Sequence, residues 1–309
     1  MTYTNFPSGV TSFGIPQVGA GTIPVTTGNY WWVSSVTGNS GGPGTPDAPY
    51  ATLAQACAVA AANDVILLAP SHAENVAAAT AITPAGVQIV GLGVGNKRPT
   101  ITFTTLNTSG YTVAVDSVSF TNISFVANFL SIAACFTLTT AKWFTVNNCS
   151  FVDTSSVLNF LNIIKSTGAA NTVDGLTFTN NVVKNLGVTS NNTTILTANS
   201  IDRLTMTWNE MKWAVQNDVS IGIIVTSGIL TNLDCGYNKG YRPNTTTAGG
   251  SLINVGGTTS TGWVYNNYVQ TLTTTSDLLF TTTVGLAAFN NYVTGVVGAS
   301  GFLIPTADS

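Results

Sequence analysis

The stretch that decides the fold is Leu176-Thr-Phe-Thr-Asn-Asn-Val-Val183, because the same frame recurs along most of the chain. Its copies begin at Val118, Phe144, Leu176, Leu204, Leu233, Gly262 and Leu286. Successive copies are therefore offset by 26, 32, 28, 29, 29 and 24 residues. A repeat of this length is typical of a solenoid, in which each repeat is one turn that packs against its neighbours.

Two columns of the repeat carry physical information. The third position is apolar in every copy: Phe120, Val146, Phe178, Met206, Cys235, Val264 and Ala288. The sixth position holds asparagine in five consecutive copies: Asn181, Asn209, Asn238, Asn267 and Asn291. Asparagine tolerates the left-handed backbone conformation and bonds locally, so we expect a chain corner at each of these residues. Amides stacked at the strand spacing also bond to one another, which predicts a structural asparagine ladder.

An apolar column beside an asparagine column predicts an all-β fold, a parallel β-helix with 24–32 residues per coil. Two or three further coils are expected upstream of the seven copies. Since each coil adds about 4.8 Å, the whole solenoid is expected to form a rod about 45 Å long.

The composition fits this architecture. The 309 residues include 50 Thr and 30 Asn, but only 9 Lys and Arg and 12 Asp and Glu, for a net charge of −3. Stacked exterior ladders favour hydroxyl and amide side chains and disfavour repeated like charges. We expect no nucleic-acid surface, because phosphate binding needs clustered Lys or Arg. We also expect no membrane span, because no run approaches 18 apolar residues.

Residues 1–45 differ from the repeats, since Gly, Pro, Ser and Thr dominate and large apolar residues are scattered among them. We expect an extended N-terminal arm here and a β-helix domain over 46–309. The apolar residues of the arm need a surface to dock on, either the body of this chain or a partner. The candidates for such contacts are Phe6, Phe13, Ile15, Trp31 and Trp32.

A short capping helix is predicted between the arm and the coils. Thr52 and Gln55 fit a capping box, which places a helix at about 52–62 and the coils at about 64–300. The first residues, 1–7, lack a basic region followed by an apolar stretch. We therefore expect synthesis and folding in a cytoplasm.

The strongest pair of acids is Asp174 and Asp202, which occupy equivalent positions in adjacent coils and are expected about 5 Å apart. That separation suits a retaining glycosidase, with Glu210 one coil further on. A structural ladder is the favoured interpretation, because the column alternates in charge and continues with hydroxyls. The column is Asp116, Lys142, Asp174, Asp202, Thr231, Ser260 and Val284. Three tryptophans are candidates either for stacking on sugar rings or for exterior contacts: Trp208, Trp213 and Trp263.

Other reactive residue types give no site. The four cysteines are widely spaced, so we expect buried free thiols and no metal centre: Cys57, Cys135, Cys149 and Cys235. His72 is the only histidine, and it follows a strand end, where a role in a turn is expected. The glycine run over 91–99 lacks the spacing of a phosphate loop and is expected to be a turn. We expect no cofactor.

Three segments near the N-terminus carry a resemblance. They are Gly44-Thr-Pro-Asp-Ala-Pro-Tyr-Ala-Thr-Leu53, Asp64-Val-Ile-Leu-Leu-Ala-Pro-Ser-His-Ala-Glu74, and Ile89-Val-Gly-Leu-Gly93 with Arg98-Pro-Thr-Ile101. They resemble the opening of right-handed parallel β-helix proteins of the pectate-lyase-like type, in particular a group encoded among the structural genes of tailed phages. The resemblance covers roughly residues 1–155, and the later coils match in periodicity alone.

The resemblance implies a virion protein on the capsid exterior, as a trimeric decoration (cement) protein, a head fibre or a tailspike. Catalytic members of the family use acidic clusters, calcium-binding aspartates or an arginine base, and no such pattern can be placed on this sequence. We therefore expect a non-enzymatic decoration protein, anchored by its arm on the major capsid protein, with the β-helix projecting. The alternative is a tailspike or fibre that binds or hydrolyses a host glycan through the face of Asp174, Asp202 and Glu210.

Overall fold

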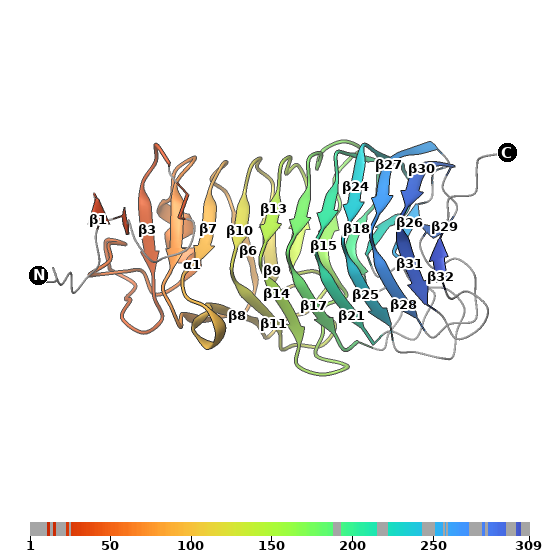
Figure 1. Cartoon of the computed structure of the whole chain (residues 1–309). Coiled ribbons are helices and arrows are strands. Elements are labelled where there is room, and N and C mark those ends of the chain that lie inside the picture. The colour runs from red at the N-terminus through yellow and green to blue at the C-terminus, as the bar shows by residue number, and fades with distance from the viewer. Residues whose placement is uncertain are drawn as a thin grey trace, which may run out of the picture.

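The computed structural model shows a rod of stacked coils, with β3 (Tyr30–Val33) near one end and β30 (Val284–Phe289) near the other (Figure 1). The structure describes residues 11–12, 15–16, 23–24, 26–187, 193–214, 222–242, 251–255, 257, 259–271, 280–281, 284–294 and 301–303. Within them, α1 (Leu53–Val59) and the 3-10 turn η1 (Gly95–Lys97) are the helical elements. The seven residues of α1 are too few to cross a membrane, and no other described helix is long and apolar enough.

Three sheets run along the rod, and each complete coil contributes one strand to each of them. The first sheet contains β3 (Tyr30–Val33), β4 (Val65–Leu68), β7 (Gln88–Gly91), β10 (Ser119–Thr121), β13 (Thr145–Asn147), β16 (Thr177–Thr179), β20 (Thr205–Thr207), β24 (Leu233–Gly236), β27 (Thr259–Tyr265) and β30 (Val284–Phe289). The second contains β5 (Ala73–Val76), β8 (Thr100–Phe103), β11 (Ser124–Ala127), β14 (Ser150–Asp153), β17 (Val182–Asn185), β21 (Glu210–Trp213), β25 (Lys239–Arg242), β28 (Tyr268–Thr271), β31 (Asn291–Thr294) and β32 (Gly301–Leu303). The third contains β6 (Ala79–Ile82), β9 (Gly110–Val113), β12 (Phe136–Leu138), β15 (Asn162–Ser166), β18 (Thr193–Thr197), β22 (Ile223–Val225), β26 (Ile253–Val255) and β29 (Phe280–Thr281).

Neighbouring strands of the three sheets pair in parallel, except for the antiparallel pair of β31 with β32. Two short pairs lie outside them: β1 (Thr11–Ser12) with β2 (Ile15–Pro16), and β19 (Ile201–Asp202) with β23 (Leu230–Thr231). Parallel strands joined by crossovers wind with a right hand. The predicted right-handed parallel β-helix is therefore confirmed.

Each copy of the sequence repeat forms one strand of the first sheet and the corner that follows it. Its apolar third column lies in register from one strand to the next, from Phe120 opposite Val146 to Val264 opposite Ala288. The seven copies are β10 to β30, and three strands of the same sheet precede them, β3, β4 and β7. The inward side chains form one continuous apolar cluster, with closely packed rings of Phe103, Phe120, Phe125, Phe136 and Phe151.

The five ladder asparagines are buried and share one pattern of hydrogen bonds to the backbone. In each coil the side-chain amide donates to a backbone carbonyl one coil earlier, as Asn209 Nδ2 does to Phe178 O at 2.8 Å. The side-chain oxygen accepts the backbone N–H of the preceding ladder residue, as Asn209 Oδ1 does from Asn181 at 2.9 Å. The same pattern continues through Asn238, Asn267 and Asn291.

The left-handed corner lies one residue earlier than the sequence predicts. None of the five ladder asparagines has a positive φ, whereas the residue before each of them does. Over all seven copies of the repeat, the corner residues are Asn122, Asn148, Asn180, Trp208, Tyr237, Asn266 and Asn290, with φ between 51 and 60°. The prediction was wrong because the ladder residue must turn its amide inward, toward the backbone of the previous coil, while the residue before it makes the bend.

The N-terminal end is closed by α1, which is shorter than the predicted helix because Ala60 is extended. Thr52 and Gln55 form the predicted capping box. The Glu74 carboxylate accepts the Leu53 N–H at 2.7 Å, and His72 Nε2 lies 3.2 Å from the same carboxylate oxygen. His72 Nδ1 also accepts the Ser35 N–H at 3.0 Å, so the imidazole fixes the cap to the first coils.

The β-helix begins before residue 46. Strand β3 lies within the segment predicted as an arm, and it pairs in parallel with β4 from Tyr30 opposite Val65 to Val33 opposite Leu68. The boundary at residue 45 therefore falls inside the first coil, because Trp31 and Val33 alternate inward as strand residues do.

Candidate functional site

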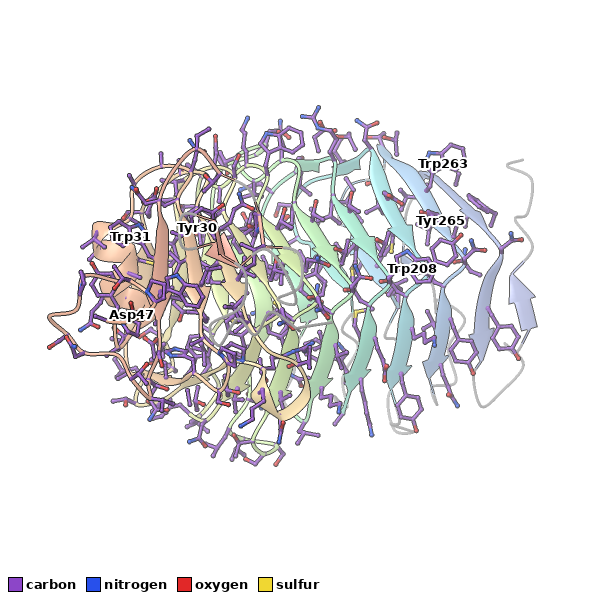
Figure 2. All side chains as sticks on the ribbon, turned by 60° about the vertical axis from the view of Figure 1, so that its left-hand side comes forward. Tyr30, Trp31, Asp47, Trp208, Trp263 and Tyr265 are labelled. Atoms are coloured by element: carbon purple, nitrogen blue, oxygen red, sulfur yellow. The ribbon has the colours of Figure 1, made fainter. Side chains whose placement is uncertain are left out.

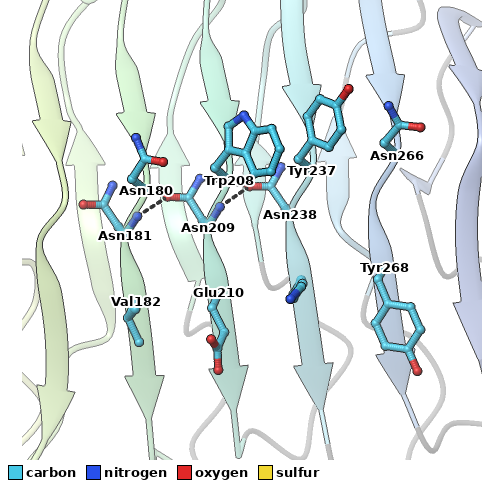
Figure 3. Close-up of a pocket in the computed structure, with 11 residues that line it drawn as sticks. Asn180, Asn181, Val182, Trp208, Asn209, Glu210, Tyr237, Asn238, Asn266 and Tyr268 are labelled. Atoms are coloured by element: carbon cyan, nitrogen blue, oxygen red, sulfur yellow. Dashed lines mark hydrogen bonds between the residues drawn. The ribbon is translucent and has the colours of Figure 1, made fainter.

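A shallow groove runs along the corner between the first and second sheets, in the C-terminal half of the rod (Figure 3). Its volume is about 340 Å³. Its lining residues are Asn180, Asn181, Val182, Trp208, Asn209, Glu210, Tyr237, Asn238, Lys239, Asn266 and Tyr268. The buried asparagine ladder forms its floor, the corner residues form one wall, and the first residues of the second-sheet strands form the other.

Trp208 and Tyr237 form the aromatic wall of this groove. They occupy the corner position in adjacent coils, and their rings stack with centroids 4.1 Å apart and an interplanar angle of 6°. Trp208 is 59% exposed and Tyr237 is 39% exposed, although both are large and apolar. Their φ values of 60 and 56° are unfavourable for bulky side chains, and all five other corners of this column are filled by asparagine. An exposed aromatic pair held in a costly backbone conformation points to a binding surface.

Further aromatic rings extend this surface toward the C-terminus. Tyr265 contacts Tyr237 at 5.4 Å and stacks on Phe289 at 5.3 Å, and Trp263 meets Phe289 edge-on at 5.8 Å. Figure 2 shows Trp208, Tyr265 and Trp263 on the outside of the C-terminal turns. On the opposite wall Tyr268 stacks on Tyr292 with centroids 5.2 Å apart.

The polar wall brings Glu210 and Lys239 together, since they lie opposite each other on the paired strands β21 and β25. Both side chains are exposed. Glu210 is the one carboxylate among the residues that line the groove. A glycosidic bond is hydrolysed by two carboxyl groups that flank it, so the groove has aromatic and hydrogen-bonding groups for a sugar without a catalytic pair.

The acids predicted as an alternative site lie elsewhere. Asp174 and Asp202 are in adjacent coils, and they line a separate pocket with Asn171, Ser200, Ile229 and Thr231. That pocket shares no residue with the groove that contains Glu210. The predicted common face of Asp174, Asp202 and Glu210 is therefore wrong, because the two aspartates precede the first sheet while Glu210 begins a strand of the second.

Both aspartates are engaged in the structural ladder that the sequence favours. Asp174 Oδ1 accepts the backbone N–H of Asp202 at 2.9 Å. Asp202 Oδ1 accepts from Thr231 Oγ1 at 2.8 Å and from Asn232 Nδ2 at 2.7 Å. The hydrogen bonds from Asn232 and Thr231, with a smaller contribution from Arg203, lower the pKa of Asp202 below its ordinary value. A carboxyl with a lowered pKa is a poor general acid at neutral pH.

No family model matches this chain, and no curated protein matches it. Solved structures do match. A rhamnogalacturonan lyase is 11% identical over 85% of this chain and 87% of its own, with a TM-score of 0.43. A pectate lyase is 12% identical over 86% and 80%, with a TM-score of 0.39. A lacto-N-biosidase from Eubacterium ramulus is 11% identical over 86% and 67%, with a TM-score of 0.37. Each is similar to this chain as a β-helix, and similarity at this level carries no inference about a reaction or a substrate.

Some of the predicted contact residues of the arm pack against other parts of this chain. Trp31 packs against the core, and its Nε1 donates to Asp64 Oδ2 at 2.7 Å. Trp32 packs with Tyr30 against an apolar cluster on the outside of the first coils. The Trp31 indole thus serves its own coil, and a capsid or subunit contact of the arm stays a prediction. Phe6 and Phe13 lie outside the described residues, and so does the side chain of Ile15.

Of the remaining candidates, Trp213 and the four cysteines are buried. Trp213 is fully buried, so it is unable to stack on a sugar, whereas Trp263 is 59% exposed. The four cysteines are free and buried, and burial raises the pKa of the Cys57 and Cys149 thiols to about 12. No group of three or more His, Cys, Asp or Glu residues that could hold a metal ion occurs in the described part of the chain.

The residues that the sequence analysis missed are Tyr237, Lys239 and Tyr268. The signal for the first was present in the repeat, since Trp208 and Tyr237 interrupt a corner column that is otherwise asparagine in the described coils. Lys239 and Tyr268 occupy one register column with Glu210. That column becomes visible only when the second-sheet strands are aligned.

Proposed function

We propose that the protein is a non-enzymatic β-helix protein of a phage virion that binds a glycan chain in the groove beside Trp208. The observation that carries the proposal is the exposed, stacked pair of Trp208 and Tyr237 at corners with positive φ. The apolar faces of sugar rings pack on aromatic rings, while amide and charged side chains beside them bond to sugar hydroxyls. Asn180, Glu210 and Lys239 supply such groups in the groove.

Binding without cleavage fits the distribution of carboxylates. The groove has Glu210 alone, and Asp174 and Asp202 accept hydrogen bonds within a ladder on another corner. A reducing-sugar assay on a bound glycan is therefore expected to detect no release. Release of reducing sugar that is abolished by Glu210→Gln or by Asp202→Asn would overturn the proposal and identify the protein as a depolymerase.

The test of binding is electrophoresis through native gels that contain one polysaccharide each: bacterial O-antigen, capsular polysaccharide, xylan, dextran or polygalacturonate. At least one of these polysaccharides is expected to retard the protein, and Trp208→Ala is expected to lose that retardation. Trp143→Ala is the matched control, because Trp143 also has a positive φ and is 49% exposed, but lies on another corner. Equal migration in every gel, or equal retardation of Trp208→Ala, overturns the proposal.

We further propose that the N-terminal end attaches the rod to the capsid exterior, with the major capsid protein as the partner and a homotrimer as the assembly. The observation that favours this end is an apolar cluster on the outside of the first coils, formed by Val65, Leu67, Val90 and Leu92. Ile23, Tyr30 and Trp32 cover it, and residues 1–22 precede Ile23 in the chain.

Deleting residues 1–22 is expected to abolish binding to purified capsids while the trimer and the glycan binding remain. Sedimentation of the full chain measures the trimer. Undiminished capsid binding by the shortened protein contradicts attachment through this end, and a monomer in sedimentation contradicts the trimer.

A further inference from the structure

A second pocket lies on the same corner as the glycan groove, toward the N-terminus. It has a volume of about 400 Å³, and its lining residues are Gly95, Asn96, Arg98, Thr100, Ser124 and Ser150. The Arg98 guanidinium reaches along the corner, and its Nη2 donates to Asn148 Oδ1 at 3.3 Å. Ser150 Oγ donates to Ser124 Oγ at 3.0 Å, so a ladder of hydroxyls faces the arginine.

The strand register places the two pockets in one line. Thr100, Ser124 and Ser150 are the first residues of β8, β11 and β14 and lie opposite one another. Ser150 lies opposite Val182, which begins the groove beside Trp208. The column then continues through Glu210, Lys239 and Tyr268. The last strand of the second pocket is therefore the direct neighbour of the first strand of the groove.

The opposite wall is also continuous. Corner residues with positive φ follow one another in seven consecutive coils: Asn122, Asn148, Asn180, Trp208, Tyr237, Asn266 and Asn290. Arg98 contacts this wall at Asn148, and the aromatic pair forms it two coils later. The groove thus lies between these two rows of residues, and the second pocket is lined by one row and reaches the other through Arg98.

We propose that the two pockets form one binding track for a long linear polysaccharide that lies parallel to the axis of the rod. This inference rests on the proposed glycan binding and adds the length and direction of the ligand. From Thr100 to Tyr268 the track crosses seven strands, or about 29 Å at the usual strand spacing. The aromatic end packs against sugar rings, and the Arg98 end donates hydrogen bonds to ring substituents of the same chain.

The test uses fragments of whichever gel polysaccharide retards the protein, separated by length, with binding measured by calorimetry. Fragments shorter than about 15 Å cover the Trp208 groove alone, and fragments longer than about 30 Å cover both pockets. We expect the long fragments to bind more tightly. Arg98→Ala is expected to weaken the long fragments about tenfold and to leave the short ones unchanged.

Two further variants separate the possible failures. Trp208→Ala is expected to weaken both lengths, and Lys165→Ala, which removes a cation from β15 in the third sheet, is expected to weaken neither. Circular dichroism of Arg98→Ala checks that the coils are intact. Affinity that is independent of length, or Arg98→Ala that binds long fragments like the unaltered protein, overturns the single track while the Trp208 groove stands. Loss of the Trp208 dependence overturns the proposed function itself.

Discussion

Replacing Asn209 by alanine tests the physical reasoning on which the whole fold depends. The side chain is 1% exposed, accepts the Asn181 N–H at 2.9 Å and donates to the Phe178 carbonyl at 2.8 Å. Alanine leaves both of these backbone groups without their side-chain partner. Since a buried unsatisfied group costs about 1–3 kcal/mol, Asn209→Ala is expected to lower the free energy of unfolding by about 2–6 kcal/mol.

The aspartate variant sharpens the prediction. Asn209→Asp keeps an oxygen for the Asn181 N–H, but its second oxygen faces the Phe178 carbonyl and can donate only when it is protonated. The loss of stability in Asn209→Asp is therefore expected to grow as the pH rises. Asn266→Ala is the control, because it removes an asparagine from a partly exposed corner that has a positive φ, and about 1 kcal/mol is expected there.

The assay combines urea denaturation with hydrogen exchange of the backbone amides. Coils in a solenoid contact only their neighbours, so Asn209→Ala is expected to speed exchange in β16 and β20 and to leave β7 unchanged. A shift of the urea midpoint no larger than that of Asn266→Ala would refute the reasoning. Uniformly faster exchange along the rod would refute the nearest-neighbour picture.

Three further predictions concern buried groups. Burial raises the pKa of the Asp153 carboxyl from its ordinary 3.8 to about 7, so the folded state holds the proton more tightly than the unfolded state. Its stabilisation is complete below about pH 4 and falls by about 4 kcal/mol as the pH rises through 7; urea midpoints should show this slope in the unaltered protein and not in Asp153→Asn. Trp31→Phe removes one of three N–H donors to the buried Asp64 carboxylate and is expected to destabilise by about 1–3 kcal/mol, and an unchanged melting temperature contradicts this. A thiol reagent is expected to modify none of the four cysteines in the folded protein and all of them in urea, because burial keeps the thiols protonated and covered; rapid labelling of the folded chain contradicts this.

The fold was predictable because the strand register of a parallel solenoid leaves a periodic pattern of residue types in the sequence. Stacking one strand on the next at a fixed spacing requires compatible residues in each column, so apolar and asparagine columns recur at the length of one coil. The capping helix was predictable for a local reason, since the hydrogen bonds between Thr52 and Gln55 involve neighbours in the chain. The start of the β-helix was not, because β3 at Tyr30–Val33 pairs with a strand that lies more than 30 residues away.

The candidate site was predictable only in part. The sequence names Trp208, Trp213 and Trp263 alike as candidates. Trp213 is buried at the end of a strand, whereas the other two are exposed. The direction of each side chain depends on whether its residue lies on the inner or outer face, which a shift of one position reverses. For the acids, equivalence in the repeat predicted the ladder in which Asp174 and Asp202 accept hydrogen bonds from backbone N–H and hydroxyl groups. It did not show that Glu210 lies on a different corner.

The contacts that a residue makes with the neighbouring coils also distinguish structural columns of the repeat from functional ones. A residue that serves the stack finds its partner in the next coil, as the ladder asparagines and Asp174 do. Trp208 and Tyr237 find one another as well, yet their rings stay exposed and their backbones take a conformation that costs energy for large side chains. Asparagine in the same column makes the same bend at lower cost, so the fold alone does not account for an aromatic pair at this corner. The acidic corner has one exposed aromatic residue with a positive φ, Trp143, whereas here two such residues stack on each other. This stacked pair is the reason for which we propose this corner, in preference to the more acidic one, as the part of the rod that binds a ligand.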